Sequence, residues 1–422
     1  MNRRELMMYA GAAGLISTLP ASKLARAAAT GPKRRLIMVY ARGGWDPTVV
    51  LDPKTQSTQV DVLAGGSRKT IGNLSYFSDP TARPNVDAFF TAHASSTAIV
   101  RGISVASVVH AECQKRMATG TRDETNADMG AIVARDHGND LPLPYLILGE
   151  TAYAGPYASS AGRVGASNQI IALLDPAQAY QTGGRPILAP TAAEEAALAA
   201  YSAAGVERTR STRGATGYNK KRIDDFASSI ERGKKLRPLR SSLGTRGRTL
   251  ALTDQIDLAL EALQGGVSQT AMLSTRVSWD DHDDITDQIP SAELTFGGLS
   301  HLMRELKTRN STLQTGTKMI DDTVVLCFSE FGRTPKKNST GGKDHWPVTA
   351  ALVMGAGIQG GRSYGATNGG LEASTVDFAT GAASATGRTL MSSHFVAGVL
   401  AACNVDPVSH LGPTEVFDAF VR

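Results

Sequence analysis

The feature that most constrains the fold is a series of short apolar runs separated by longer amphipathic stretches. The run at 35–40 ends before Gly43 and Gly44, which is typical of a buried central strand followed by a loop. The run at 322–328 contains several β-branched residues and is bounded by Asp and Gly residues, as strands often are. Four further runs of this kind lie at 97–102, 143–149, 270–277 and 350–355.

Helical patterns lie between these runs. Apolar residues recur at helical spacing from Leu252 to Leu263 and stop before Gly265, and a second set begins near Pro290 and ends at Leu306. Buried strands that alternate with helices predict an α/β fold with a largely parallel central sheet flanked by helices. Because ligands of such sheets lie beyond the carboxyl ends of the strands, we expect the chemistry there.

The amino-terminal residues resemble a twin-arginine signal peptide. Arg3 and Arg4 precede a weakly apolar stretch at 9–19, and the alanines at 27–29 offer a small-residue cleavage site. The stretch is shorter than the roughly 20 residues that span a bilayer. We therefore predict that residues 1–29 direct export to the periplasm or cell envelope. An amphipathic helix that stays on the protein is the alternative.

The remaining residues, 30–422, are predicted to form one domain. Residues 208–248 contain thirteen Lys or Arg residues against three acidic ones and few apolar residues. This composition predicts a solvated, basic helical insertion or cap at about 190–250, with an anion-binding lobe as the alternative. After the signal region no apolar segment reaches transmembrane length, so we expect no membrane span in the mature chain.

Charge and cysteine content exclude several classes of protein. The formal net charge is +5, but the signal region contributes four basic residues and one acidic residue, which leaves about +2 for the mature chain. We therefore expect no nucleic acid partner. The three cysteines, Cys113, Cys327 and Cys403, form no Cys-x-x-Cys pair, so neither a disulfide framework nor a cysteine zinc site is expected.

Acidic residues and histidines follow several of the predicted strands. Several carboxylates around one histidine are costly to hold together unless water or a cation neutralises them. Carboxylates and imidazoles at the carboxyl edge of a sheet are suitable ligands for zinc, manganese or iron. The predicted metal ligands are Asp46, Asp280 or its neighbour Asp281, His282, Glu330, Asp344 and His345.

Two sequence blocks carry a resemblance to a known family. Residues 329–335 (Ser-Glu-Phe-Gly-Arg-Thr-Pro) and 341–347 (Gly-Gly-Lys-Asp-His-Trp-Pro) resemble the signature of the exported bacterial proteins grouped as domain of unknown function 1501. Residues 43–46 and 279–282 also fit this pattern. That family is similar to the alkaline-phosphatase and sulfatase superfamily, so the resemblance implies a metal-bearing α/β fold that cleaves phosphate or sulfate esters. The implied cofactor is a divalent ion such as zinc, manganese or calcium, and the implied partner is an anionic ester.

The resemblance also implies roles for individual residues. Asp46 would be the early metal ligand, Asp280 and His282 the middle ligands, Glu330 the ligand after the late strand and His345 the last one. The chain departs from the superfamily at Phe331, where a histidine usually follows the acid, so a second metal would lose a ligand.

No clear nucleophile stands at the start of the helix after the second strand. The catalytic candidates are His110 and Ser107, with Arg333 or Arg42 to hold the anionic group. A metal-dependent ester hydrolase is the first hypothesis. A non-catalytic envelope protein, with an envelope component as its partner, is the second. The sequence leaves the oligomeric state open.

Overall fold

The protein is described by a computed structural model that covers residues 31–123, 125–149, 151–163, 191–214, 216–236 and 251–422. The signal region predicted at 1–29 lies outside the described residues. In the described part of the chain, no helix combines the length and apolar character needed to cross a membrane.

A central eight-stranded sheet has the strand order β12-β4-β11-β8-β1-β7-β5-β6. Strand β11 runs antiparallel to its two neighbours, and the other neighbouring pairs are parallel. The prediction of a largely parallel sheet is thus confirmed, with β11 as the exception. The strand bounds are β1 Arg35–Tyr40, β4 Thr97–Ser104, β5 Tyr145–Ile147, β6 Ala161–Arg163, β7 Thr270–Ser274, β8 Thr323–Phe328, β11 Val348–Gly355 and β12 Arg362–Tyr364.

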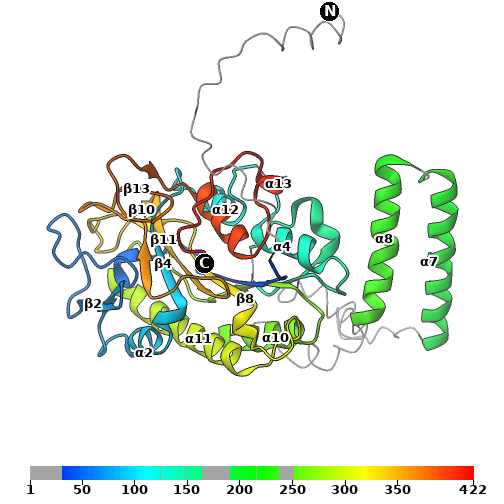
Figure 1. The fold of residues 1–422 in the computed structure, drawn as a ribbon, viewed down its shortest axis with the longest axis horizontal. Helices are drawn as coiled ribbons and strands as arrows, with labels where there is room; N and C mark the ends of the chain where they lie inside the picture. Colours follow the sequence, from blue (N-terminus) through cyan, green and yellow to red (C-terminus); the bar gives the residue numbers. More distant parts are fainter. Residues whose placement is uncertain (1–30, 124, 150, 164–190, 215, 237–250) are drawn as a thin grey trace, which may run out of the picture.

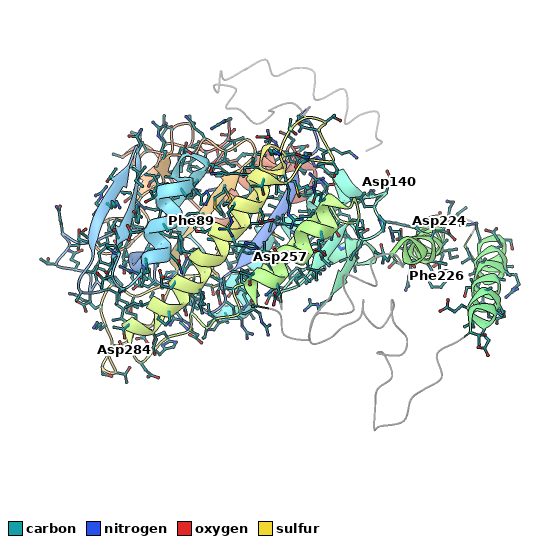
Figure 2. All side chains as sticks on the ribbon, turned by 90° about the horizontal axis from the view of Figure 1, so that it is seen from below. Phe89, Asp140, Asp224, Phe226, Asp257 and Asp284 are labelled. Atoms are coloured by element: carbon teal, nitrogen blue, oxygen red, sulfur yellow. The ribbon has the colours of Figure 1, made fainter. Side chains whose placement is uncertain are left out.

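Helices cover both faces of this sheet (Figure 1). Because side chains alternate along a strand, Ile37 and Val39 of β1 enter one core cluster, whereas Leu36 and Met38 enter the other. Phe89 of α2 lies in the first of these clusters, on the face that Figure 2 shows from below. The first layer contains α2 Pro84–His93, α10 Leu252–Gln264 and α11 Gln288–Thr308, and the second contains α3 His110–Thr119, α4 Met129–Gly138 and α12 Ser392–Ala402.

The smaller elements lie in the connections. They are the antiparallel pairs β2 Ser67–Ile71 with β3 Leu74–Ser78, β9 Gly332–Arg333 with β10 His345–Trp346, and β13 Thr375–Val376 with β14 Arg388–Thr389, and the short helices η1 Pro47–Val49, η2 Ala94–Ser96, η3 Gly155–Ser160, η5 Ile285–Asp287, η6 Met319–Asp321 and α13 Val408–Leu411. All three cysteines are free and buried, which agrees with the expectation that they form no disulfide.

Two further helices, α7 Ala192–Thr212 and α8 Gly217–Leu236, stand beside the body of the protein (Figures 1 and 2). Arg210 of α7 pairs with Asp224 of α8 at 3.0 Å, and Arg232 of α8 donates to the backbone oxygen of Ser159 in η3. Both helices fall within the stretch where a basic helical insertion is predicted. Residues 237–250 of that stretch lie outside the described residues.

Candidate functional site

Five segments bring polar side chains to one edge of the central sheet. Four of them follow the carboxyl ends of β1, β4, β7 and β8, and the fifth, residues 343–347, precedes β11. Because β11 is antiparallel, its start lies at the edge where its neighbours end. This topology explains how Asp344 and His345, which come before a strand, reach the same edge as Glu330, which comes after one.

Glycine at position 43 allows the loop after β1 to lie against the loop after β7. Gly43 has a φ of +119°, and a Cβ built there would lie 2.4 Å from the backbone nitrogen of Asp280. Its own N–H donates to Oε1 of Glu330 at 2.9 Å. A larger residue would therefore be strained in its backbone and would push Asp280 out of place.

Glu330 and His110 form a buried carboxylate–imidazole pair. Glu330 is fully buried, and its Oε1 lies 2.9 Å from Nδ1 of His110, the first residue of α3. Burial alone raises the pKa of Glu330, but the hydrogen bonds from His110 and Gly43 outweigh it and hold the pKa below its usual value. The same hydrogen bond raises the pKa of His110. Glu330 thus fixes the ring and leaves Nε2 of His110 directed into the site.

The other two histidines are held in the same way. Nδ1 of His345 lies 2.9 Å from the backbone oxygen of Val108, and Nδ1 of His282 lies 3.1 Å from Oδ1 of Asp344. A carbonyl or carboxylate oxygen can only accept, so in each ring the proton of a neutral imidazole is assigned to Nδ1. Burial lowers the pKa of His345, which favours its neutral form.

The three Nε2 atoms converge on Asp280. Oδ1 of Asp280 lies 3.1 Å from Nε2 of His282 and 3.3 Å from Nε2 of His345, and Oδ2 lies 3.3 Å from Nε2 of His110. The Nε2 atoms of His282 and His345 are 3.0 Å apart. Two neutral imidazoles cannot face each other with lone pairs at that distance unless a proton or a cation lies between them. We call His110, Asp280, His282 and His345 the imidazole cluster.

The distances in this cluster fit a divalent ion. Ligand atoms of His110, Asp280 and His345 all lie within 4.8 Å of one another. Zinc–nitrogen bonds of about 2.0–2.1 Å in a tetrahedral site separate two ligands by about 3.3 Å. Metal-binding histidines usually donate their other N–H to a carboxylate or carbonyl, which is the arrangement of all three rings here. The residues present therefore fit a zinc-type ion better than calcium, which prefers oxygen ligands.

Arg333 is a buried cation that holds the loops of the site together. Its Nη2 donates to Oδ1 of Asp280 at 2.7 Å. The guanidinium also donates to the backbone oxygens of Gly43, Gly44, Trp279, Asp281 and Lys343. Burial opposes ionisation of Asp280, but Arg333 outweighs it and lowers the pKa of this carboxyl to about 2. Nη1 of Arg333 also lies 3.2 Å from Nε2 of His282. With a fully buried side chain and these partners, Arg333 positions Asp280 instead of facing solvent as a ligand for an anion would.

Asp46 lies outside the imidazole cluster. Its Oδ1 accepts from the backbone N–H and the hydroxyl of Thr48 at 2.8 and 2.7 Å, which starts the short helix η1. Its Oδ2 lies 2.6 Å from Nζ of Lys343, and both side chains are buried. A lysine thus neutralises the residue that the sequence suggests as the early metal ligand.

The remaining candidates are placed as follows. The hydroxyl of Ser107 donates to Glu112 of α3 at 2.8 Å. Asp281 accepts from the backbone N–H groups of Asp283 and Asp284 and so caps a turn, which leaves Asp280 as the member of the pair in the cluster. Asp344 is largely exposed and contacts the cluster through His282. Glu330 contacts it through His110.

Sequence reasoning missed Lys343 as a partner of the site. The residue stands inside the block at 341–347, directly before Asp344 and His345, but nothing in that pattern indicates which acid it neutralises. The sequence indicates His110 as a catalytic candidate and not as a metal ligand, and its contact with Asp280, 170 positions away in the numbering, was not predicted. A histidine at the first position of a helix that follows a strand was the available signal.

Several solved structures are similar to this chain at low identity. The C-terminal periplasmic domain of EcEptC from Escherichia coli has 7% identity and a TM-score of 0.43, with 90% of this chain and 85% of that chain covered. A protein in the alkaline phosphatase superfamily from Vibrio parahaemolyticus has 10% identity and a TM-score of 0.40, covering 92% and 70%. The PsFucS1 sulfatase from Pseudoalteromonas sp. has 10% identity and a TM-score of 0.36, covering 92% and 70%.

Because these TM-scores lie below 0.5, the fold assignment rests on the sheet order and helix layers described above. No sequence among the curated proteins compared with this chain matches it significantly. The family described as "Protein of unknown function (DUF1501)" matches residues 33–386, which is most of the chain. The two sequence blocks at 329–335 and 341–347, which supply Glu330, Arg333, Lys343 and His345 to the site, fall within that match, and the chain belongs to the DUF1501 family.

Proposed function

We propose that this chain is an exported, metal-dependent hydrolase of phosphate or sulfate esters. The observation that carries the proposal is the convergence of three Nε2 atoms on Asp280, with each Nδ1 bonded to an oxygen acceptor. Three imidazoles beside a carboxylate suit a divalent ion of the zinc type. When bound, such an ion supplies Lewis-acid polarisation of an ester oxygen.

The chain's own residues would do the following. His110, His282 and His345 bind the ion, and Arg333 keeps Asp280 ionised and oriented beside it. Arg42, an exposed residue in the loop after β1, is suited to hold the anionic oxygens of the ester, because guanidinium binds phosphate and sulfate groups in a bidentate manner. Asp344 and Glu330 orient the rings of His282 and His110. In this proposal Asp46 has a structural role and does not bind the ion.

Ser107 bears on the choice between two routes of attack. Its hydroxyl is bonded to Glu112, which favours a route without a covalent serine intermediate. The Ser107→Ala variant should therefore keep its turnover within about twofold, whereas a serine nucleophile would make the loss several orders of magnitude.

Export completes the proposal. We propose that residues 1–29 are a twin-arginine signal and that residues 30–422 form one mature domain, with a basic insertion or cap at about 190–250. Replacing both Arg3 and Arg4 by Lys should hold the precursor in the cytoplasm. Unchanged export of that variant would contradict the signal assignment.

The test of the hydrolase proposal uses the mature chain loaded with zinc or manganese. We expect it to cleave an aryl phosphate, an aryl sulfate or a phosphodiester, and we expect a chelator and the His345→Ala change to abolish the cleavage. A protein with metal bound that cleaves none of the three would overturn the proposal. That result would favour a binding or assembly protein of the cell envelope, with the basic segment at 208–248 as the place to seek its partner.

A further inference from the structure

The candidate ligands at the edge of the sheet fall into two groups. The imidazole cluster presents Nε2 lone pairs to a shared space. Asp46, by contrast, has both of its oxygens engaged within the protein, by Thr48 on one side and by Lys343 on the other. We propose that Lys343 is a built-in counter-cation for Asp46 that takes the place of a second metal ion, so that this edge of the sheet binds a single divalent ion on the imidazole cluster.

The burial of the pair supports a permanent interaction. Asp46 is 3% exposed and Lys343 is 2% exposed, and Nζ lies 2.6 Å from Oδ2. An isolated charge in such a place would be strongly disfavoured, because neither water nor an opposite charge would compensate it. Each residue therefore needs the other, or needs a substitute of the same charge.

A metal ion cannot share this carboxylate with the ammonium group. Oδ2 is the oxygen of Asp46 that Thr48 does not use, and Nζ already lies against it. A divalent ion bound to the same oxygen would lie within a few ångström of a positive charge in a site with little water, where like charges repel strongly. The ammonium group and an ion at Asp46 are thus mutually exclusive.

The charges of the site agree with one ion. Four carboxylates of the site each pair with a basic side chain or an imidazole ring. They belong to Asp46, Asp280, Glu330 and Asp344. Two buried cations, Lys343 and Arg333, offset two of these charges, on Asp46 and Asp280. Two negative charges are left, which is the charge that one divalent ion compensates.

Lys343 also connects the two halves of the site. It stands two positions before His345, and its backbone oxygen accepts a hydrogen bond from Nη1 of Arg333 at 3.0 Å. Arg333 in turn donates to Oδ1 of Asp280. The pair therefore ties the segment that carries His345 to the loop after β1 without a metal ion between them.

The experiment measures bound metal and needs no substrate. The inference rests on the metal centre of the proposed function, and metal content is measured by elemental mass spectrometry after zinc loading and gel filtration of the mature chain. We expect one zinc per wild-type chain. We expect the double variant Asp46→Asn/Lys343→Met, which removes the pair without leaving a lone charge, also to bind one zinc, with its Kd within about tenfold of the wild type.

The single variant Lys343→Met makes the test sharper. It keeps a side chain of similar length but leaves the charge of Asp46 without its cation, so we expect a second zinc ion to bind there. The double variant lacks that charge and should not bind the second ion. A matched control is Asp322→Asn/Arg35→Met, which removes a buried pair of the same 2.6 Å length at the amino end of β1 and should leave one zinc. Should Lys343→Met fail to fold, the double variant still decides the question.

Three outcomes would overturn the inference. They are two zinc ions on the wild-type chain, a double variant that binds none, and a folded Lys343→Met protein that still binds one. A protein with one zinc but no esterase activity would support the inference and contradict the proposed hydrolase. An active protein with two zinc ions would do the reverse.

Discussion

Two halves of one sheet edge use similar residues in different ways. In the imidazole cluster, outer partners such as Glu330 hold each ring by Nδ1 and leave Nε2 directed inward. In the other half, Lys343 forms an ion pair with the carboxylate of Asp46 and neutralises its charge. The comparison teaches that a carboxylate at a strand end is unsuited to bind a metal ion where the protein engages both of its oxygens, as at Asp46. Asp280 has Arg333 on Oδ1 but keeps Oδ2 beside His110.

The largest expected effect is the loss of a cluster imidazole. His345→Ala removes one of three converging nitrogens, so zinc affinity should fall by more than about 100-fold, since even changes to the outer partners of metal ligands cost about 10- to 100-fold. The measurement is a competition titration against a chromophoric chelator. The matched control is His301→Ala on α11, a histidine that pairs with Asp257 of α10.

Equal zinc affinity in the His345→Ala and His301→Ala proteins would break the comparison. It would mean that the convergence of the rings has no part in binding an ion. Asp257, the partner of His301, is labelled on the helical face that Figure 2 shows.

The next effect comes from the outer partners. Glu330→Gln keeps an acceptor for the ring of His110 but removes the buried charge, so zinc affinity should fall about 10- to 100-fold. Asp344→Asn should cost less, because the side chain of Asp344 is exposed and solvent screens its charge. Asp257→Asn on α10, which removes the partner of His301, is the corresponding control. A Glu330→Gln protein with unchanged affinity would show that His110 is not a ligand.

The smallest expected effect is a change in folding stability at low pH that does not involve metal binding. Burial, together with Lys307 and Arg304, lowers the pKa of His93 to about 4, so the folded state keeps this ring neutral. The unfolded state binds a proton first as the pH falls through 6.5, so the stability from His93 is complete above pH 6.5 and is lost below it. For the metal-free protein we expect a loss of about 1 kcal/mol at pH 6 relative to pH 7.5.

The measurement for His93 is urea unfolding at both pH values with a chelator present. The His93→Gln variant, which keeps an acceptor for Lys307, should lose less stability over the same interval, and the difference isolates His93 from the cluster histidines. An identical pH dependence for both proteins would refute the assignment.

The sequence predicted the central sheet well because most residues of these short runs are apolar and amphipathic stretches separate the runs. All six predicted strands belong to the sheet, and both predicted helices are present, although α11 begins at Gln288, slightly before Pro290. The edge strands β6 and β12 were not predicted. Each has three residues and no apolar period that would distinguish it from a loop.

The candidate site was predictable in residue types but not in pairings. Asp280, His282 and His345 were predicted from their positions at strand ends, and the structure brings them together. The contact of Lys343 with Asp46 joins residues 297 positions apart. It depends on how the whole chain folds, so no local sequence pattern predicts it. For the same reason the burial of Arg333 and its contacts with five backbone oxygens could not be predicted from its neighbours in sequence.

The convergence of imidazoles is tested most directly by X-ray absorption at the zinc edge on the mature chain loaded with one equivalent of zinc. The account predicts a first shell at about 2.0–2.1 Å with the outer-ring scattering of about three imidazoles. It also predicts that His345→Ala removes one of them and that Asp46→Asn/Lys343→Met removes none. A shell of oxygen atoms with no imidazole scattering, or one altered by the loss of Asp46 but not by the loss of His345, would contradict the account.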